Sequence, residues 1–192
     1  MPLRLAGARA VLWLVTAICL GTFAIAGAST VEAPTLQQMV DRSSRIFVGE
    51  VIGTRSYRTG DSIHTDVTFR TSDVLKGAES PLVVLTFLGG TVDDVTLEVS
   101  GMPRFTVGDE QVIFAVEAAG QVSPLVGMWH GRVRVSRDTS GTARVLRNDG
   151  TPFERSTAVT QPAAVASDRI IVAMRLDAFV SDVRQLIRGG RR

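Results

Sequence analysis

His64, Asp66 and His130 are the first candidates for acid–base chemistry in this chain. His64 and Asp66 stand two residues apart in an alternating run, so we expect them on one face of a strand, about 7 Å apart. Together with His130 they could form a dispersed hydrolase site, but a serine would have to come from elsewhere. No G-x-S-x-G turn indicates such a serine. We therefore predict no catalytic residues and keep a hydrolase using these three residues as the alternative.

Metal and cofactor sites lack their usual sequence patterns. No H-E-x-x-H or H-x-H pattern occurs, so a histidine metal site would need a further ligand from elsewhere. Asp93, Asp94 and Glu98 could offer carboxylate oxygens to a hard cation, yet an acidic turn between two strands explains them without a metal. Gly89-Gly90 is followed by neither the helix nor the lysine of a P-loop. We predict no metal site and no cofactor.

Trp129, His130 and Arg132 form the strongest candidate for a binding site. The chain has two tryptophans, and Trp13 lies in the apolar N-terminal segment described next. An exposed aromatic side chain flanked by hydrogen-bond donors is typical of anchor residues in protein interfaces. The alternative is that Trp129 belongs to the core or caps a barrel. We predict that these three residues contribute to binding.

The N-terminal segment has the pattern of a secretory signal peptide. Arg4 and Arg9 precede an uncharged run of 19 residues, 10–28, which ends in small residues suited to cleavage near Ala26 or Ala28. We predict residues 1–28 as a signal peptide and 29–192 as one exported domain, periplasmic or extracellular. The alternative is an uncleaved N-terminal membrane anchor, because about 20 apolar residues span a bilayer. Otherwise we expect membrane contact only during export.

Removal of that segment changes the charge and the cysteine content. The chain has 21 basic and 19 acidic residues, and without Arg4 and Arg9 the two numbers are equal. A neutral domain gives no indication of nucleic-acid binding, and Arg184 and Arg188 suit the C-terminal end of a helix. Cys19, the only cysteine, is also removed. The exported domain must therefore fold without a disulfide.

Alternation of apolar and polar residues predicts a mainly β fold. Thr35 to Gln38 has the form of a capping box and predicts a short N-terminal helix to about Ser43. Residues 154–168 lack periodicity and predict a loop, whereas residues 176–187 carry the apolar stripe of a C-terminal amphipathic helix. Between the helices we predict strands at residues 46–54, 63–70, 82–88, 95–99, 112–116, 125–129, 132–136 and 143–147. Strands in this number without helices between them favour antiparallel pairing in a barrel or sandwich, and the uncharged run 82–88 favours a central strand.

The order of several short motifs resembles that of uncharacterised bacterial exported domains and, more loosely, of netrin-like/TIMP-like OB-fold barrels. The motifs are Ile46-Phe-Val-Gly-Glu-Val51, Val67-Thr-Phe69, Val74-Leu-Lys-Gly77 and Phe105-Thr-Val-Gly-Asp-Glu110 followed by Val112-Ile-Phe114. The match covers about residues 36–117 and implies an antiparallel OB-like barrel. TIMP-type inhibition depends on a cysteine-anchored N-terminus, which the domain without Cys19 cannot form, so the inhibitory residues are not carried over.

These observations favour a non-enzymatic exported β-barrel domain that binds a protein or another envelope component. The chain combines a signal-peptide pattern and a good apolar core with no assembled catalytic set. Two alternatives stay open: the hydrolase described above, and a structural envelope module with no ligand of its own. We expect no nucleic-acid partner.

Overall fold

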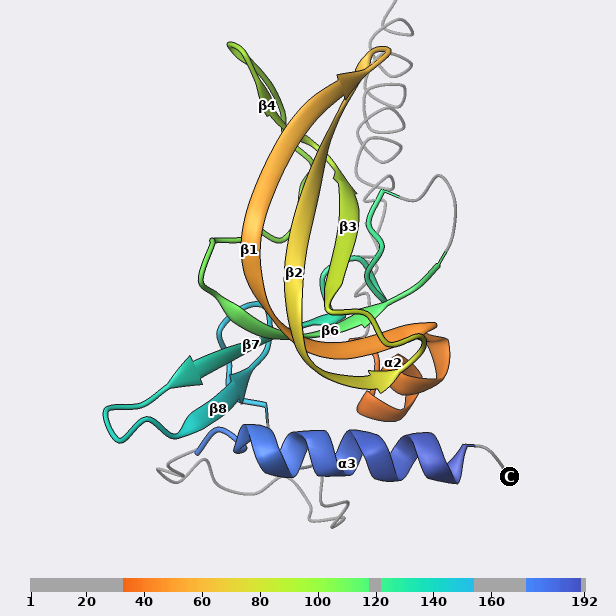
Figure 1. Ribbon diagram of the computed structural model, residues 1–192, viewed down its shortest axis with the longest axis vertical. Coiled ribbons are helices and arrows are strands. Elements are labelled where there is room, and N and C mark those ends of the chain that lie inside the picture. Colours follow the sequence, from red (N-terminus) through yellow and green to blue (C-terminus); the bar gives the residue numbers. More distant parts are fainter. Residues whose placement is uncertain (1–32, 118–121, 154–171, 191–192) are drawn as a thin grey trace, which may run out of the picture. The chain divides into compact units, whose positions relative to one another are not determined.

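The computed structural model describes residues 33–117, 122–153 and 172–190 (Figure 1). These residues belong to one unit, Ala33–Arg192. The predicted signal peptide and the predicted loop at 154–168 lie outside the described residues. No helix within the described ranges has the length and apolar character needed to cross a membrane.

The main sheet is antiparallel and has six strands in the order β3-β2-β1-β6-β7-β8. Its strands are β1 (Arg45–Thr59), β2 (Ser62–Lys76), β3 (Leu82–Leu88), β6 (Glu110–Ala115), β7 (Arg132–Arg137) and β8 (Ala143–Leu146). A separate hairpin consists of β4 (Gly90–Val92) and β5 (Val95–Leu97), and the helices are α2 (Leu36–Arg42) and α3 (Leu176–Gly189). The predictions of a mainly β, antiparallel fold with a short N-terminal helix and a C-terminal helix are confirmed.

Strands β1 and β2 are longer than predicted, and both curve strongly (Figure 1). Three register shifts interrupt their pairing, next to Phe47, Gly49 and Gly53. Such bulges bend a strand and increase its twist. Gly49 allows a close approach at its bend, because a Cβ there would lie 3.0 Å from the carbonyl oxygen of Arg70. The bending lets β1 pair with β2 along its whole length while only its first residues, 45–50, pair with β6.

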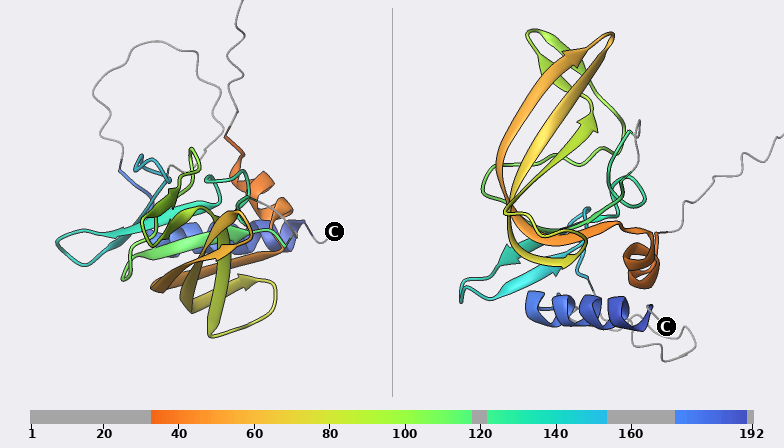
Figure 2. Two further views of the ribbon diagram at one scale, coloured as in Figure 1. Left: turned by 90° about the horizontal axis from the view of Figure 1, so that it is seen from above. Right: turned by 45° about the vertical axis from the view of Figure 1, so that its right-hand side comes forward.

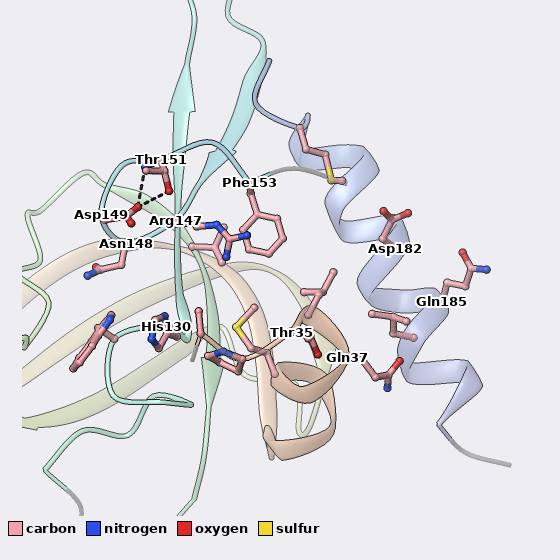
Figure 3. A pocket seen from close by; sticks show the side chains of 18 residues that line it. Thr35, Gln37, His130, Arg147, Asn148, Asp149, Thr151, Phe153, Asp182 and Gln185 are labelled. Carbon is pink, nitrogen blue, oxygen red and sulfur yellow. Dashed lines mark hydrogen bonds between the residues drawn. The ribbon is translucent and has the colours of Figure 1, made fainter. Parts of the chain in front are cut away.

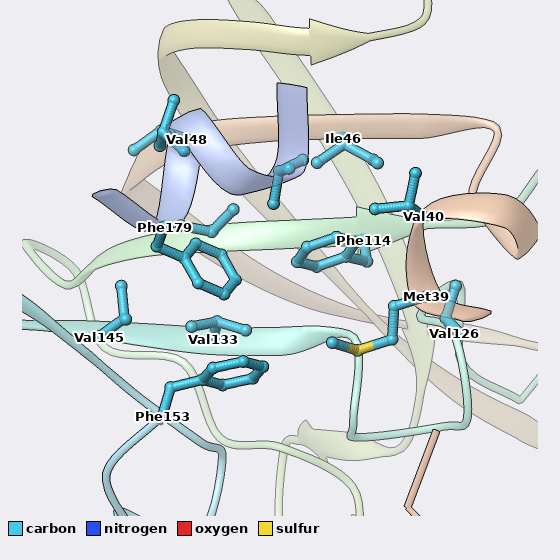
Figure 4. Close-up of a cluster of buried hydrophobic side chains, with 13 residues drawn as sticks. Met39, Val40, Ile46, Val48, Phe114, Val126, Val133, Val145, Phe153 and Phe179 are labelled. Atoms are coloured by element: carbon cyan, nitrogen blue, oxygen red, sulfur yellow. The ribbon is translucent and has the colours of Figure 1, made fainter. Parts of the chain in front are cut away.

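Strand β1 and strand β6 are buried on both faces at the centre of the sheet. Ile46 and Val48 point to one face, and Phe47, between them, points to the other. The first face packs against both helices (Figure 4); its buried residues are Met39, Val40, Ile46, Val48, Val112, Phe114, Val126, Val133, Val145, Phe153, Phe179, Val180 and Val183. The second face lies inside the curl of the first three strands; its buried residues are Phe47, Val51, Val67, Phe69, Val83, Phe87, Ile113, Ala115 and Leu125. The burial on both faces is confined to residues 46–51 of β1 and 112–115 of β6, and it explains why these two stretches are mostly apolar.

The two helices have the local signals that the sequence predicts. Thr35 caps α2 through a complete capping box, in which Gln38 returns a hydrogen bond to the main chain of Thr35. Helix α3 places Phe179 and Val183 fully in the core and ends at the predicted glycines. It lies against β8 and beside α2 (Figure 2). An ion pair of 2.7 Å between Arg184 and a carboxylate of β2 also ties α3 to the sheet.

Two strand predictions are wrong: the strand at residues 125–129 and the central position of residues 82–88. Residues 125–129 do not form a strand, because Gly127 and Met128 have positive φ angles of 61° and 63° and turn the chain. Strand β3 is an edge strand rather than a central one, since among the described strands it pairs only with β2. Its two faces also differ: Val83 and Phe87 are buried in the core, whereas Leu82 and Val84 on the other face are exposed.

Candidate binding groove

A groove of about 1010 Å³ lies where both helices meet the end of the sheet (Figure 3). Four segments form it: the start of α2, the turn at 127–131, the segment 147–153 that follows β8, and one side of α3. We refer to this cavity, together with the residues that line it, as the groove. Its lining residues are Ala33, Pro34, Thr35, Leu36, Gln37, Met39, Trp129, His130, Val133, Arg147, Asn148, Asp149, Thr151, Phe153, Met174, Asp182, Gln185 and Leu186.

The turn at 127–131 positions Trp129 and His130 in the groove. Main-chain hydrogen bonds tie both ends of this turn to Phe114 of β6: Val126 N donates to Phe114 O, and Phe114 N donates to Gly131 O. Gly131 N also donates to Val126 O and closes the turn. Gly131 is packed against the main chain, since a Cβ on it would lie 2.5 Å from the oxygen of Phe114. The two predicted residues are therefore presented by a turn that is fixed to the central strand β6.

Trp129 is half-buried, so it is neither a full core residue nor a free surface residue. Its ring packs closely over Gly101, where a Cβ would come within 2.8 Å of the indole atom Cζ3. The ring of His130 lies 5.2 Å from the indole ring, centroid to centroid. Trp129 is thus held rigidly from one side and contributes its remaining surface to the groove.

Burial, together with Arg147, favours the neutral form of His130. Burial lowers the pKa of His130, the neighbouring Arg147 lowers it further, and Asp149 opposes this in part. The imidazole is consequently uncharged at neutral pH and can offer one hydrogen-bond donor and one acceptor. Arg147 itself lies with its guanidinium 4.6 Å from the centre of the Phe153 ring. This cation–π contact orients a permanent positive charge at the groove.

Asp149 is an ionised group at the groove, held by its own loop. Its carboxylate accepts hydrogen bonds from the main-chain N and the hydroxyl of Thr151, at 2.9 and 2.7 Å (Figure 3). These bonds lower the pKa of Asp149, with a smaller contribution from Arg147. The hydroxyl of Thr151 is therefore already used as a donor.

Apolar side chains line the interior of the groove between these polar groups. Met39, Val133 and Phe153 are buried and belong to the core beneath it, and Met174 and Leu186 pack against them. Gln37 and Gln185 are exposed on the two helices that flank the groove. An apolar interior with a few polar groups at fixed positions is the usual composition of a binding cavity.

Arg132, the third predicted binding residue, is in a different environment. Its side chain is buried, with its Nε donating to Gln111 Oε1 at 2.8 Å and its Nη1 to Asn148 Oδ1 at 3.2 Å. The guanidinium lies 4.9 Å from the centre of the Phe105 ring. Burial, with repulsion from a neighbouring arginine, lowers its pKa to about 10, against the attraction of Asp109. Arg132 is charged at neutral pH and joins elements beneath the groove instead of lining it.

The residues of the hydrolase alternative are not brought together at the groove. His64 lies on β2, where its ring stacks on Tyr57 with centroids 6.0 Å apart. Asp66 accepts hydrogen bonds from the hydroxyls of Tyr57 and Thr86, at 3.3 and 2.7 Å. Of the three residues only His130 lines the groove.

Within the part of the chain that the structure describes, no group of three or more His, Cys, Asp or Glu side chains lies close enough together to bind a metal ion. Asp93 and Asp94 form the turn between β4 and β5, and Asp93 has a positive φ of 52°. The acidic-turn interpretation of these residues agrees with this position.

Sequence reasoning missed Arg147, Phe153, Gln37 and Gln185 as groove residues. Each belongs to a different local context: the end of a hairpin, the segment after it, and two separate helices. Their spacing carries no signal, because only the packing of α2 and α3 on the sheet brings them together.

No known protein family, curated protein or solved structure matches this chain. The geometry of the groove is therefore the basis on which a function can be proposed.

Proposed function

We propose that this chain is an exported, non-enzymatic binding domain whose groove holds a segment of a partner protein in the cell envelope. The observation that carries the proposal is the groove of about 1010 Å³ with a rigidly packed Trp129 at its wall. Ligand cavities commonly measure about 300–1,000 Å³. A groove at the upper end of this range suits a peptide segment with an apolar side chain.

The polar groups of the groove support binding to a polypeptide. His130 and the glutamines offer donors and acceptors for main-chain groups, and Arg147 offers a fixed positive charge. Tryptophan and arginine are the residues most enriched among those that dominate interface energies. The groove therefore suits an extended peptide segment. Its main chain would bond to the neutral donors and acceptors, one apolar side chain would enter the interior, and an acidic side chain would pair with Arg147.

The hydroxyl groups of the groove favour binding over nucleophilic catalysis. Thr35 Oγ1 accepts the capping hydrogen bond from Gln38 N at 3.2 Å. Thr151 Oγ1 donates to Asp149. A catalytic hydroxyl needs a base that accepts its proton. Neither hydroxyl is hydrogen-bonded to His130, and the carboxylate that Thr151 contacts, that of Asp149, is a poor base because its pKa is lowered.

For the fold, we propose an OB-like barrel. The order β6-β1-β2-β3 is that of a Greek key, in which the fourth strand returns beside the first, and OB-folds are partly open five-stranded Greek-key barrels. The curl of β1 and β2 around the second core, with β7 as the fifth strand, supports this assignment.

For the location, we propose export with cleavage near Ala26 or Ala28, on the sequence pattern of residues 1–28. N-terminal sequencing of the protein recovered from its native host tests this. A start near residue 27 or 29 is expected, whereas a membrane-bound chain that begins at Met1 would contradict it.

Site-specific photo-crosslinking in the native host tests the binding function. A photoreactive amino acid replaces Gln37 or Gln185, which flank the groove from two helices, or Thr139, an exposed residue of the β7–β8 turn, as the control. We expect the same partner protein to be captured from both groove positions and not from the control. Capture should weaken in Trp129→Ala and in Arg147→Ala, with folding checked by circular dichroism.

The same experiment can contradict the proposal. Equal capture from Thr139, no intermolecular product from either glutamine, or products confined to the chain itself would each show that the groove does not hold a partner segment. Capture that both variants leave unchanged would show the same.

A further inference from the structure

Strand β3 leaves one of its edges unpaired within the described residues. The direction of its hydrogen bonds follows from two contacts with β2: Thr71 N donates to Pro81 O at 3.0 Å, and Gly89 N donates to Ile63 O at 2.7 Å. In an antiparallel pair, successive residues direct their main-chain groups to opposite sides. Odd-numbered residues of β3 therefore bond to β2, and even-numbered residues direct their N–H and C=O groups away from the sheet.

The free edge is short and has a defined boundary at each end. Leu82, Val84 and Thr86 direct their main-chain groups outward. Before them the outward residue Ser80 is already used, since its hydroxyl donates to Leu82 O and its carbonyl accepts from the hydroxyl of Thr71, and after them Leu88 N donates to Val122 O at 3.0 Å. Val84 and Thr86 thus offer both main-chain groups to a further strand, and Leu82 offers its N–H.

The free edge lacks the devices that normally protect an edge strand. Such strands usually carry charged residues, a proline or a bulge, whereas residues 82–88 contain no charge, proline or glycine and pair with β2 without a register shift. The side chains of Leu82 and Val84 are 51% and 55% exposed.

The opposite edge of the sheet shows the contrast. Strand β8 is covered by neighbouring chain, with Val145 N donating to Met174 O and Phe153 N donating to Val145 O. Of the two edges of this sheet, the chain therefore covers that of β8 and leaves that of β3 open, as far as the described residues extend.

We propose that two copies of this chain pair through β3, antiparallel, around a twofold axis at Val84. In this register Val84 faces Val84 of the second copy, and Leu82 faces Thr86. The three outward residues of each copy then exchange six main-chain hydrogen bonds, three N–H groups from each side, and Leu82 O, which already accepts from the Ser80 hydroxyl, accepts the N–H of Thr86 as its second donor. The uncharged strand meets itself without repulsion, and the exposed Leu82 and Val84 side chains become covered on the same face of the joined sheet. A second copy satisfies every free group of this edge and extends no further than its two boundaries.

The pairing is reversible, because the contact is small. Stable interfaces bury about 1,200–2,000 Å², and two five-residue strand edges with two exposed side chains each bury less. The dimer therefore forms as the concentration rises, with a dissociation constant in the micromolar range, on the order of 1–100 μM.

Disulfide trapping tests the register. The full chain is expressed with Cys19→Ser, and Val84→Cys, Thr86→Cys or Val95→Cys is added as the only thiol. Residues that face each other in a hydrogen-bonded antiparallel pair have Cα atoms about 5.5 Å apart, within the range of a disulfide. Thr86 and its symmetry mate are four residues apart along the strand, about 14 Å. Mild oxidation should therefore link Val84→Cys into dimers, but not Thr86→Cys.

Val95→Cys is the matched control, because Val95 is 50% exposed and lies on the separate hairpin. Equal dimer yield from all three positions would indicate random collision and overturn the proposal. So would a monomer at Val84→Cys, or a disulfide only at Thr86→Cys, which would show another register.

Sedimentation velocity tests the association without a crosslink. The wild-type protein should shift from monomer to dimer between about 1 and 100 μM. Val84→Lys puts two like charges directly opposite each other and should keep the protein monomeric over this range, whereas Val95→Lys should behave as wild type. A monomeric wild type at the highest concentration, or a dimer that Val84→Lys leaves intact, would refute pairing through β3. If Val84→Lys leaves the dimer intact but Val95→Lys abolishes it, the contact lies at the β4–β5 hairpin instead.

Discussion

Replacing Arg132 with methionine should destabilise the domain without removing a groove contact. The guanidinium of Arg132 donates to Gln111 and Asn148 and lies over the ring of Phe105. Gln111 is itself fully buried, and its Nε2 has no hydrogen-bond partner among the described residues. Methionine keeps the apolar stem and most of its packing but leaves the Oε1 atom of Gln111 unpaired as well.

The magnitude follows from the two hydrogen bonds. Each hydrogen bond to a charged group contributes about 1.5–3 kcal/mol, and the half-exposed Asp109, 3.7 Å away, adds about 0–1 kcal/mol. We expect Arg132→Met to lower the free energy of unfolding by about 3–5 kcal/mol, a large part of the stability of an ordinary domain.

Urea unfolding followed by circular dichroism measures this change, and a double-mutant cycle gives its cause. Gln111→Leu combined with Arg132→Met removes both polar groups and should recover stability to within about 1 kcal/mol of wild type. Arg134→Met, on an exposed residue of the same strand, is the control and should change stability by less than about 0.5 kcal/mol. A loss below about 1 kcal/mol in Arg132→Met, or a double variant whose loss equals the sum of both singles, would refute this account of the buried network.

Three further changes probe the core, the turn and the groove. Phe179→Ala removes a fully buried ring that packs edge-on against two other phenylalanines and should cost about 3–5 kcal/mol in urea unfolding; a loss under 1 kcal/mol would contradict its central place. Gly131→Ala should cost about 1–3 kcal/mol because its Cβ would meet a main-chain oxygen at 2.5 Å, whereas Gly53→Ala, with nothing within 4 Å, should cost less. The lowered pKa of His130 means that the unfolded chain binds its proton first as the pH falls below about 6.5. His130 should therefore favour folding above that pH and less so below it, and His130→Gln should flatten the stability profile between pH 7.5 and 5; an unchanged profile would contradict the assigned pKa shift.

Short sequence patterns predicted both helices, because capping and helical periodicity depend only on residues close together in the sequence. The capping box at Thr35 and Gln38 satisfies main-chain groups of one helical turn, so four residues suffice to specify it. The apolar stripe from Leu176 to Ile187 predicted α3, because apolar residues that recur with a 3.6-residue period lie on one face of an α-helix. The turn between β7 and β8 also rests on local physics, because the Asp138 carboxylate accepts from the main-chain N of Ser140 and Thr142 there.

Position within the sheet could not be predicted in the same way. The uncharged run of β3 has the composition of a central strand, and only the strand order makes it an edge. Residues 125–129 are apolar enough for a strand, but the positive φ at Met128, which no local rule indicates, turns them. The groove depends on the same non-local information, since Trp129 and Arg147 come from separate segments on either side of the β7–β8 hairpin, and Gln185 joins them only where α3 packs on the sheet.

The apolar edge and the groove use separate parts of the unit, and this separation has a functional consequence. No residue of β3 lines the groove, and no groove residue belongs to the strands that flank β3. A dimer joined at Val84 would therefore carry two open grooves, and a partner with two copies of the recognised segment would be held more strongly by both than by one. Val84→Lys should leave capture from Gln37 intact for a single segment and weaken it for a repeated one. Loss of single-segment capture in that variant would instead show that the groove forms only in the dimer, and that the two surfaces are one site.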